Sequence, residues 1–205
     1  MNKLAIAFVA LAFVTISAVS QASNPQPARP KCNLTEATAP SLRGLRLGMS
    51  TQQLLALFPG SSKRREMKDS IEKAKAATGD DAAYLAFDPG ADGDAQQFGG
   101  VESVSAGVNK GRVIDLSIQY GGATWKDIDE WVAKLSEALK LQGPGDWTAG
   151  PNENPNKVLR CEGIEIEAAI QGGGSSIRMT NTEYFSGVLD RAKAAEDKKR
   201  REIKP

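Results

Sequence analysis

The sequence predicts an α+β fold in which helices cover one face of an antiparallel sheet. Three N-cap signatures are each followed by apolar residues at helical spacing. Several shorter segments alternate apolar and polar residues, which is typical of strands that bury one side and expose the other. With 205 residues, the chain is long enough for one domain with a substantial core.

The N-terminal residues have the three parts of an export signal. Lys3 precedes an apolar run over residues 4–14, and small residues lead to a cleavage point after Ala22. The run is shorter than the roughly 20 apolar residues of a membrane span. The alternative to a cleaved signal is that these residues form an uncleaved anchor helix. Residues 1–22 are therefore predicted to be a signal peptide, with no stable membrane span after cleavage and a periplasmic or secreted product.

The predicted mature chain has a leader, a domain and a charged end. Residues 23–31 carry three prolines and no core residue, which is typical of a flexible leader. A single domain is expected over residues 32–185, and a charged helix end over residues 186–205.

The first helix is expected to begin at the N-cap Ser50, because Gln53 lies three residues later and can bond back to it. Pro59 and Gly60 then end the helix. Residues 62–78 predict a second helix that is mostly solvated, since its apolar stripe is thin.

A strand and a hairpin are expected next. Residues 84–88 predict a short strand, and residues 101–120 predict a hairpin with its turn at residues 109–111. The polar residues of the return strand are expected to face solvent; they are Asp115, Ser117 and Gln119.

The second half of the chain repeats this order. A helix is expected from the N-cap Thr124, which has Asp127 three residues later, and Gly143 ends it. Alternating residues predict strands at residues 158–161 and 164–170.

The chain is expected to end in a strand and a long helix. The last strand contains Ile177 and Met179, and Thr180 with Glu183 has the spacing of a capping box. The apolar residues that line one side of this final helix are Tyr184, Phe185, Val188, Leu189 and Ala192. The order of elements therefore suggests two tandem repeats, over residues 45–120 and 121–181.

The opening of the first helix, Gly48-Met49-Ser50-x-x-Gln53-Leu54, resembles the first helix of small exported proteins of the SmpA/BamE and beta-lactamase-inhibitor-protein type. The resemblance implies helices on one face of an antiparallel sheet, carried twice in tandem in the inhibitor proteins. It also implies a binding or scaffolding domain rather than an enzyme. No cysteine lies at the predicted cleavage site, so the resemblance does not extend to a lipid anchor.

The two cysteines, Cys32 and Cys161, are expected to form a disulfide, because export into an oxidising compartment favours pairing. The alternative is one buried thiol and one surface thiol. If the bridge forms, neither sulfur is available as a nucleophile.

The composition excludes several kinds of chemistry. The chain has no histidine, which removes histidine general bases, histidine-based triads and zinc sites that need imidazole. A formal charge of +1 lacks the basic excess of a nucleic-acid-binding protein. No cofactor and no nucleic-acid partner are therefore expected.

Two acidic groups are candidates for a functional site. Three carboxylates in residues 88–94 suggest a calcium loop, but glycine occupies the third and twelfth positions of the helix-loop-helix pattern, so a solvated loop without metal is expected. Glu165 and Glu167 lie on one face of a strand and are spaced as in a glycan hydrolase. The simpler interpretation is that both belong to the solvent-facing side of a sheet.

A loop at residues 147–156 is the main candidate for recognition. Trp147 heads a polar segment that contains Asn152 and Asn154, and Trp125 is expected to be half-exposed on the same side. The alternative is that Trp147 closes the edge of the core.

Together these patterns favour an exported, non-enzymatic protein that binds a protein or an envelope component through the solvent-facing side of its sheet and the Trp147 loop. The alternatives are a carboxylate-dependent glycan hydrolase and an inhibitor of an extracellular enzyme.

Overall fold

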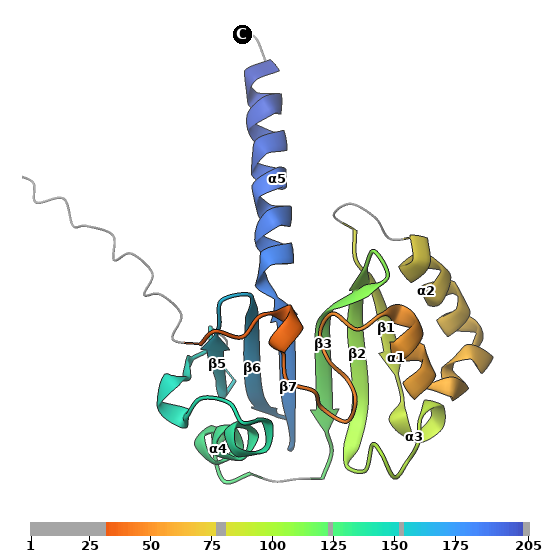
Figure 1. The fold of residues 1–205 in the computed structure, drawn as a ribbon, viewed down its shortest axis with the longest axis vertical. Coiled ribbons are helices and arrows are strands. Elements are labelled where there is room, and N and C mark those ends of the chain that lie inside the picture. The colour runs from red at the N-terminus through yellow and green to blue at the C-terminus, as the bar shows by residue number, and fades with distance from the viewer. Residues whose placement is uncertain (1–31, 77–80, 123–124, 152–153, 203–205) are drawn as a thin grey trace, which may run out of the picture.

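The structure is a computed structural model in which residues 32–76, 81–122, 125–151 and 154–202 are described (Figure 1). The predicted signal peptide (residues 1–22) and leader (residues 23–31) lie outside these ranges.

The predicted α+β fold is confirmed. The described residues form one antiparallel sheet of seven strands in the order β1-β2-β3-β7-β6-β5-β4. The strands are β1 (Ala83–Phe87), β2 (Val101–Asn109), β3 (Arg112–Tyr120), β4 (Thr148–Ala149), β5 (Asn156–Arg160), β6 (Ile164–Gln171) and β7 (Gly174–Asn181).

The described helices α1 to α4 lie on one side of this sheet (Figure 1). The α-helices are α1 (Thr51–Leu57), α2 (Arg65–Ala76), α3 (Pro89–Asp92), α4 (Ile128–Leu139) and α5 (Thr182–Glu202). Short 3-10 turns cover Glu36–Thr38, Pro59–Lys63 and Pro144–Asp146. Helix α5 starts at the end of β7 and projects away from the sheet, so the predicted apolar stripe on it does not enter the core, and Leu189 is 66% exposed.

Each half of the chain supplies consecutive neighbouring strands, β1–β3 and β4–β7, and the last strands of the two runs pair at the centre of the sheet. Both segments predicted as repeats are runs of consecutive antiparallel strands, three in the first and four in the second, so the repeat stays a prediction. They differ in their helices: the first segment contains α1, α2 and α3, whereas the second contains only α4 among the described residues.

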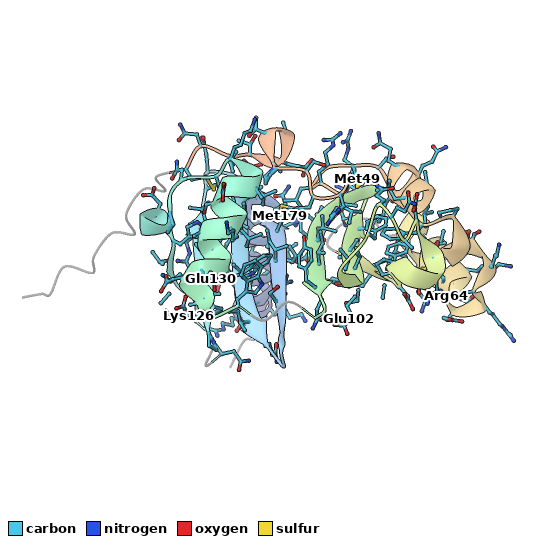
Figure 2. All side chains as sticks on the ribbon, turned by 90° about the horizontal axis from the view of Figure 1, so that it is seen from below. Met49, Arg64, Glu102, Lys126, Glu130 and Met179 are labelled. Carbon is cyan, nitrogen blue, oxygen red and sulfur yellow. A yellow bond between two sulfur atoms is a disulfide. The ribbon has the colours of Figure 1, made fainter. Side chains whose placement is uncertain are left out.

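The core spans both halves. Met49 and Met179 come from opposite halves and are both buried in it (Figure 2). Phe58, at the end of α1, is fully buried and stacks on Phe87 and Phe98, with ring centroids 4.3 and 4.8 Å apart. These rings join α1, β1 and the segment before β2 into one unit.

The first helix starts as predicted. Ser50 accepts a hydrogen bond from the backbone N–H of Gln53, and the Gln53 side chain accepts one from the backbone N–H of Ser50. This reciprocal pair satisfies two N–H groups that a helix start otherwise leaves without a partner.

The predicted starts of two later helices are wrong by a few residues. Helix α4 is capped by Asp127, whose carboxylate accepts the backbone N–H of Glu130, and Thr124 lies outside the described residues. Helix α5 is capped by Asn181, whose side-chain oxygen accepts the backbone N–H of Tyr184. In the second case β7 extends through Thr180, because the strand pairs on both of its sides and Thr180 is needed in that ladder.

The predicted disulfide is confirmed: Cys32 and Cys161 are bonded, with an S–S distance of 2.06 Å. Both residues are buried, and the backbone N–H of Glu162 donates to the carbonyl of Cys32. The bridge fixes the start of the described chain against the turn between β5 and β6, and it is compatible with an oxidising compartment.

Candidate functional site

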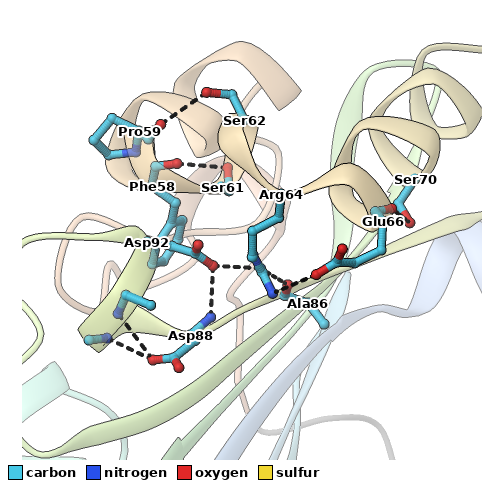
Figure 3. Close-up of polar contacts among 12 residues, drawn as sticks. Phe58, Pro59, Ser61, Ser62, Arg64, Glu66, Ser70, Ala86, Asp88 and Asp92 are labelled. Carbon is cyan, nitrogen blue, oxygen red and sulfur yellow. Dashed lines mark hydrogen bonds and ion pairs between the residues drawn. The ribbon is translucent and has the colours of Figure 1, made fainter.

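The acidic segment 88–94 supports its own fold. The Asp88 carboxylate caps α3 by accepting the backbone N–H groups of Gly90 and Ala91 (Figure 3). Asp92 is 2% exposed. Its carboxylate accepts one hydrogen bond from an Arg64 guanidinium nitrogen, at 2.6 Å, and another from the backbone N–H of Asp88, at 3.0 Å. The expectation of a solvated loop is therefore wrong for Asp92, since a distant arginine compensates the burial of its charge.

In the part of the chain that the structure describes, no three histidine, cysteine, aspartate or glutamate side chains are grouped so that they could hold a metal ion. Within the same residues, no helix has the length and apolarity to cross a membrane.

The sheet face opposite α1 to α4 carries polar side chains in two rows that run across the strands. We call it the polar face. One row consists of the cross-strand neighbours Tyr84, Gly107, Asp115, Thr180, Glu165 and Arg160. The second consists of Ala86, Ser105, Ser117, Arg178, Glu167 and Val158.

An ion pair lies near the middle of the polar face. Arg178 donates from Nε and Nη2 to one carboxylate oxygen of Asp115, at 3.0 and 2.6 Å, and the Thr180 hydroxyl lies 3.3 Å from the same oxygen. The Asp115 side chain is only 4% exposed, whereas that of Arg178 is 49% exposed. The prediction that Asp115 faces solvent is therefore wrong: the carboxylate is covered, and the guanidinium that covers it is presented outward.

This contact holds Arg178 in one orientation, while its guanidinium is charged in any case. Hydrogen bonding to Asp115 raises the pKa of the Arg178 guanidinium, against the opposing effect of burial. A guanidinium held from two nitrogens loses less freedom when it binds a further group.

Tyr84 lies across the neighbouring strand. Its partner in β2 is Gly107, where an added methyl group would lie 3.1 Å from the Tyr84 ring. The same methyl group would lie 3.1 Å from Cβ of Asp115. The missing side chain at Gly107 thus lets the ring approach the sheet beside the ion pair, and Tyr84 remains 56% exposed.

The predicted pair of glutamates belongs to this face and has local partners. Glu165 forms an ion pair with Arg160 at 3.1 Å, and Glu167 accepts from the Asn156 side-chain amide at 2.7 Å. A hollow of about 180 Å³ lies beside Glu167 and Arg178. Its volume is below the roughly 300 Å³ of the smaller ligand pockets.

The residues predicted for the recognition loop do not form one site. Trp147 is 5% exposed and donates its indole N–H to the Ser136 hydroxyl of α4 at 3.2 Å. Its role as a surface anchor is therefore wrong, and the alternative that it closes the edge of the core is correct. Asn152 lies outside the described residues, and Asn154 is exposed at the hollow beside Glu167.

Trp125 lies in a different place, as one wall of a pocket of about 690 Å³ between α4, the end of the β2–β3 hairpin and residues 41–43. It is half-buried, as predicted, and its indole N–H donates to the Ser175 hydroxyl at 3.1 Å.

No protein-family model, curated protein or solved structure matches this chain. The resemblance of residues 48–54 to the SmpA/BamE type therefore stays a prediction, and the site must be judged on its own geometry.

Two residues of the polar face, Tyr84 and Arg178, were missed as site residues. Each stands in an ordinary alternating strand, and the sequence holds no local motif around it. The usable signal was Gly107, because a glycine inside a strand often marks a close approach by another group.

Tyr120, in the wall of the Trp125 pocket, is expected to make the free energy of unfolding fall as the pH becomes alkaline. Burial raises the pKa of its hydroxyl above the ordinary value of 10.0, while the nearby Arg43 lowers it. The stabilisation from a raised pKa is complete below the unfolded-state pKa and is lost as pH rises through the folded-state pKa. Denaturant titrations between pH 8 and 11 should show wild type losing stability above about pH 10 more steeply than Tyr120→Phe. Equal slopes would contradict the assignment, and Tyr84→Phe, on the exposed polar face, is the control.

Proposed function

We propose that this chain is a non-enzymatic binding protein, exported to an oxidising compartment, which binds a partner protein through its polar face. The periplasm or the extracellular medium is the proposed location, supported by the export-signal pattern in residues 1–22 and by the Cys32–Cys161 bridge.

The observation that carries the proposal is the pair Tyr84 and Arg178, which both lie near Asp115 on the sheet face that α1 to α4 leave open. Tyrosine and arginine are among the residues that contribute most to protein interfaces, especially near the centre of the contact. The Tyr84 ring packs over Gly107, and the Arg178 guanidinium is bonded to Asp115. Binding a partner therefore costs little further side-chain freedom.

The shape of the face favours a macromolecule over a small substrate. The strands beside Tyr84 carry short side chains at Ala86, Ser105 and Ser117, which leave the surface around the ring accessible to a large partner. The hollow of about 180 Å³ beside Glu167 gives a small molecule little burial, whereas a protein can cover both rows. The partnered glutamates and the absence of histidine from the sequence also favour binding over hydrolysis.

The test is capture of partners from envelope extract and culture fluid of the source cells with chains that begin at residue 23. Wild type is compared with Tyr84→Ser and Ser105→Arg. Loss of the tyrosine is expected to weaken the captured complex about 30-fold, corresponding to about 2 kcal/mol for an anchor residue. The introduced arginine should block the flat region without removing a contact of the fold.

Gln52→Arg on α1 is the matched control, because it adds the same side chain at an exposed position on the helix-covered side. A captured protein supports the proposal only if both face variants lose it and the control keeps it. A partner that all variants retain, or crosslinks that map only to the helices, would contradict it. Glycan hydrolysis abolished by Glu165→Gln or Glu167→Gln would favour the enzyme instead.

A further inference from the structure

The pocket beside Trp125 lies apart from the polar face, and the proposed function does not use it. Its volume of about 690 Å³ falls in the range of small-molecule sites. Its walls come from residues 41–43, the open end of the β2–β3 hairpin at Gly100 and Tyr120, Trp125, α4 and Ser175 of β7.

Aromatic rings form one side of the pocket. The Trp125 and Trp131 rings are 4.9 Å apart at an angle of 32°, and Tyr120 meets Trp131 edge-on at 5.5 Å. Both indole N–H groups are bonded within the protein, Trp125 to the Ser175 hydroxyl and Trp131 to the Ser176 carbonyl, each at 3.1 Å. The rings are thus held in place and need no polar ligand group. Trp131 is only 6% exposed, so the apolar surface available to a hydrophobic ligand is mainly that of the half-buried Trp125.

One cation at this pocket is not matched by a carboxylate. Lys134 pairs with Glu137, with 3.4 Å between nitrogen and oxygen. Arg43 donates only to the backbone carbonyl of Gly99, at 3.3 Å, and none of the described carboxylates forms an ion pair with it. The pocket therefore combines an apolar interior with one uncompensated positive charge.

The position of Arg43 is built into the chain. Its φ of 55° lies in the left-handed region, which non-glycine residues rarely adopt, and it precedes Gly44 in a tight turn closed by reciprocal backbone bonds between Leu42 and Leu45. The Gln97 side chain donates to the Arg43 carbonyl at 2.7 Å. The turn is thus held from two sides, and the guanidinium is held at the carbonyl of Gly99, next to the pocket residue Gly100.

We propose that this pocket binds an amphipathic organic anion, whose apolar body packs on Trp125 and Trp131 and whose carboxylate pairs with Arg43. A neutral or cationic compound of the same shape gains the same apolar burial but lacks the charged contact.

Three probes of one shape separate these contributions: 4-phenylbutyrate, 4-phenylbutanamide and 4-phenylbutylamine. Calorimetric titration of the chain from residue 23 should show the anion binding about three- to five-fold more tightly than the amide, as expected for a partly exposed ion pair. The amine should bind most weakly.

Two substitutions at Arg43 test the charge. Arg43→Asn removes it with a residue that tolerates positive φ, so the anion should fall to the affinity of the amide while the amide is unchanged. Arg43→Lys keeps the charge and should retain most of the preference. Trp125→Ala should weaken all three probes more than about ten-fold, with thermal unfolding used to show that the variant is folded.

Matched controls separate the pocket from general charge effects. The double variant Lys134→Gln/Glu137→Gln removes a pocket cation together with the carboxylate that it pairs with, and Arg46→Gln removes an exposed arginine outside the pocket. Both should leave the preference for the anion intact. The proposal is overturned if wild type binds none of the probes at millimolar concentration, if anion and amide bind equally, or if Arg43→Asn leaves their ratio unchanged. None of these outcomes bears on the polar face, so the two proposals fail separately.

Discussion

Replacing Cys32 and Cys161 together by alanine is expected to lower the free energy of unfolding by about 4 to 5 kcal/mol. The bridge joins residues 129 apart in the sequence, so it removes a large part of the freedom of the unfolded chain. It also holds the segment that contains Leu34, whose carbonyl accepts the backbone N–H of Gly163. Without the bridge, this first described segment is tied by few bonds.

Urea unfolding followed by circular dichroism measures the effect. Wild type in excess reductant should unfold at the same urea concentration as the double variant, and reductant should not change the variant. An unchanged midpoint in the variant would show that the bridge contributes little to stability.

Phe58→Ala should destabilise the protein by about 3 to 5 kcal/mol, the range for truncating a large buried aromatic residue. Phe58 is fully buried between Phe87 and Phe98, and a methyl group added at Gly93 would lie 3.2 Å from its ring. This close packing leaves little room for the neighbours to fill the cavity.

Phe58→Leu is the matched variant, since it keeps much of the apolar volume and loses only the ring stacking. It should cost about 1 to 2 kcal/mol. Thermal and denaturant unfolding give both values. If the alanine variant were no less stable than the leucine variant, the three rings would not be the structural unit that their geometry indicates.

The fold was predictable wherever the signal is local. Ser50 and Gln53 form their capping box because both partners lie within one helical turn, and the strand at 164–171 follows from simple alternation. The disulfide was predictable because only two cysteines exist. The start of α4 was misplaced because Thr124 and Asp127 both suit an N-cap, and the charged group, which interacts more strongly with the helix dipole, caps the helix.

The site was much less predictable, because its contacts join distant residues. Arg178 and Asp115 are 63 positions apart, and no sequence pattern around either residue predicts that the two pair. The same holds for Trp147, which has the composition of a surface loop around it and yet bonds to Ser136. Among the predicted recognition residues that the structure describes, Trp125 lines the large pocket beside α4 and Asn154 lines the hollow beside Glu167, so the two lie at separate places.

The strand order also determines when the sheet can be completed. β7 is the last strand in the sequence and the middle strand of seven, so the strands β1 to β3 keep an open hydrogen-bonding edge at β3 until residue 181 is available. A chain that emerges from its N-terminus, from a ribosome or through a membrane, therefore exposes that edge while the residues between β3 and the end of β7 are still emerging. Such edges pair readily with other chains. A copy shortened before β7 lacks the strand that joins β3 to β6 and so links the two halves of the sheet.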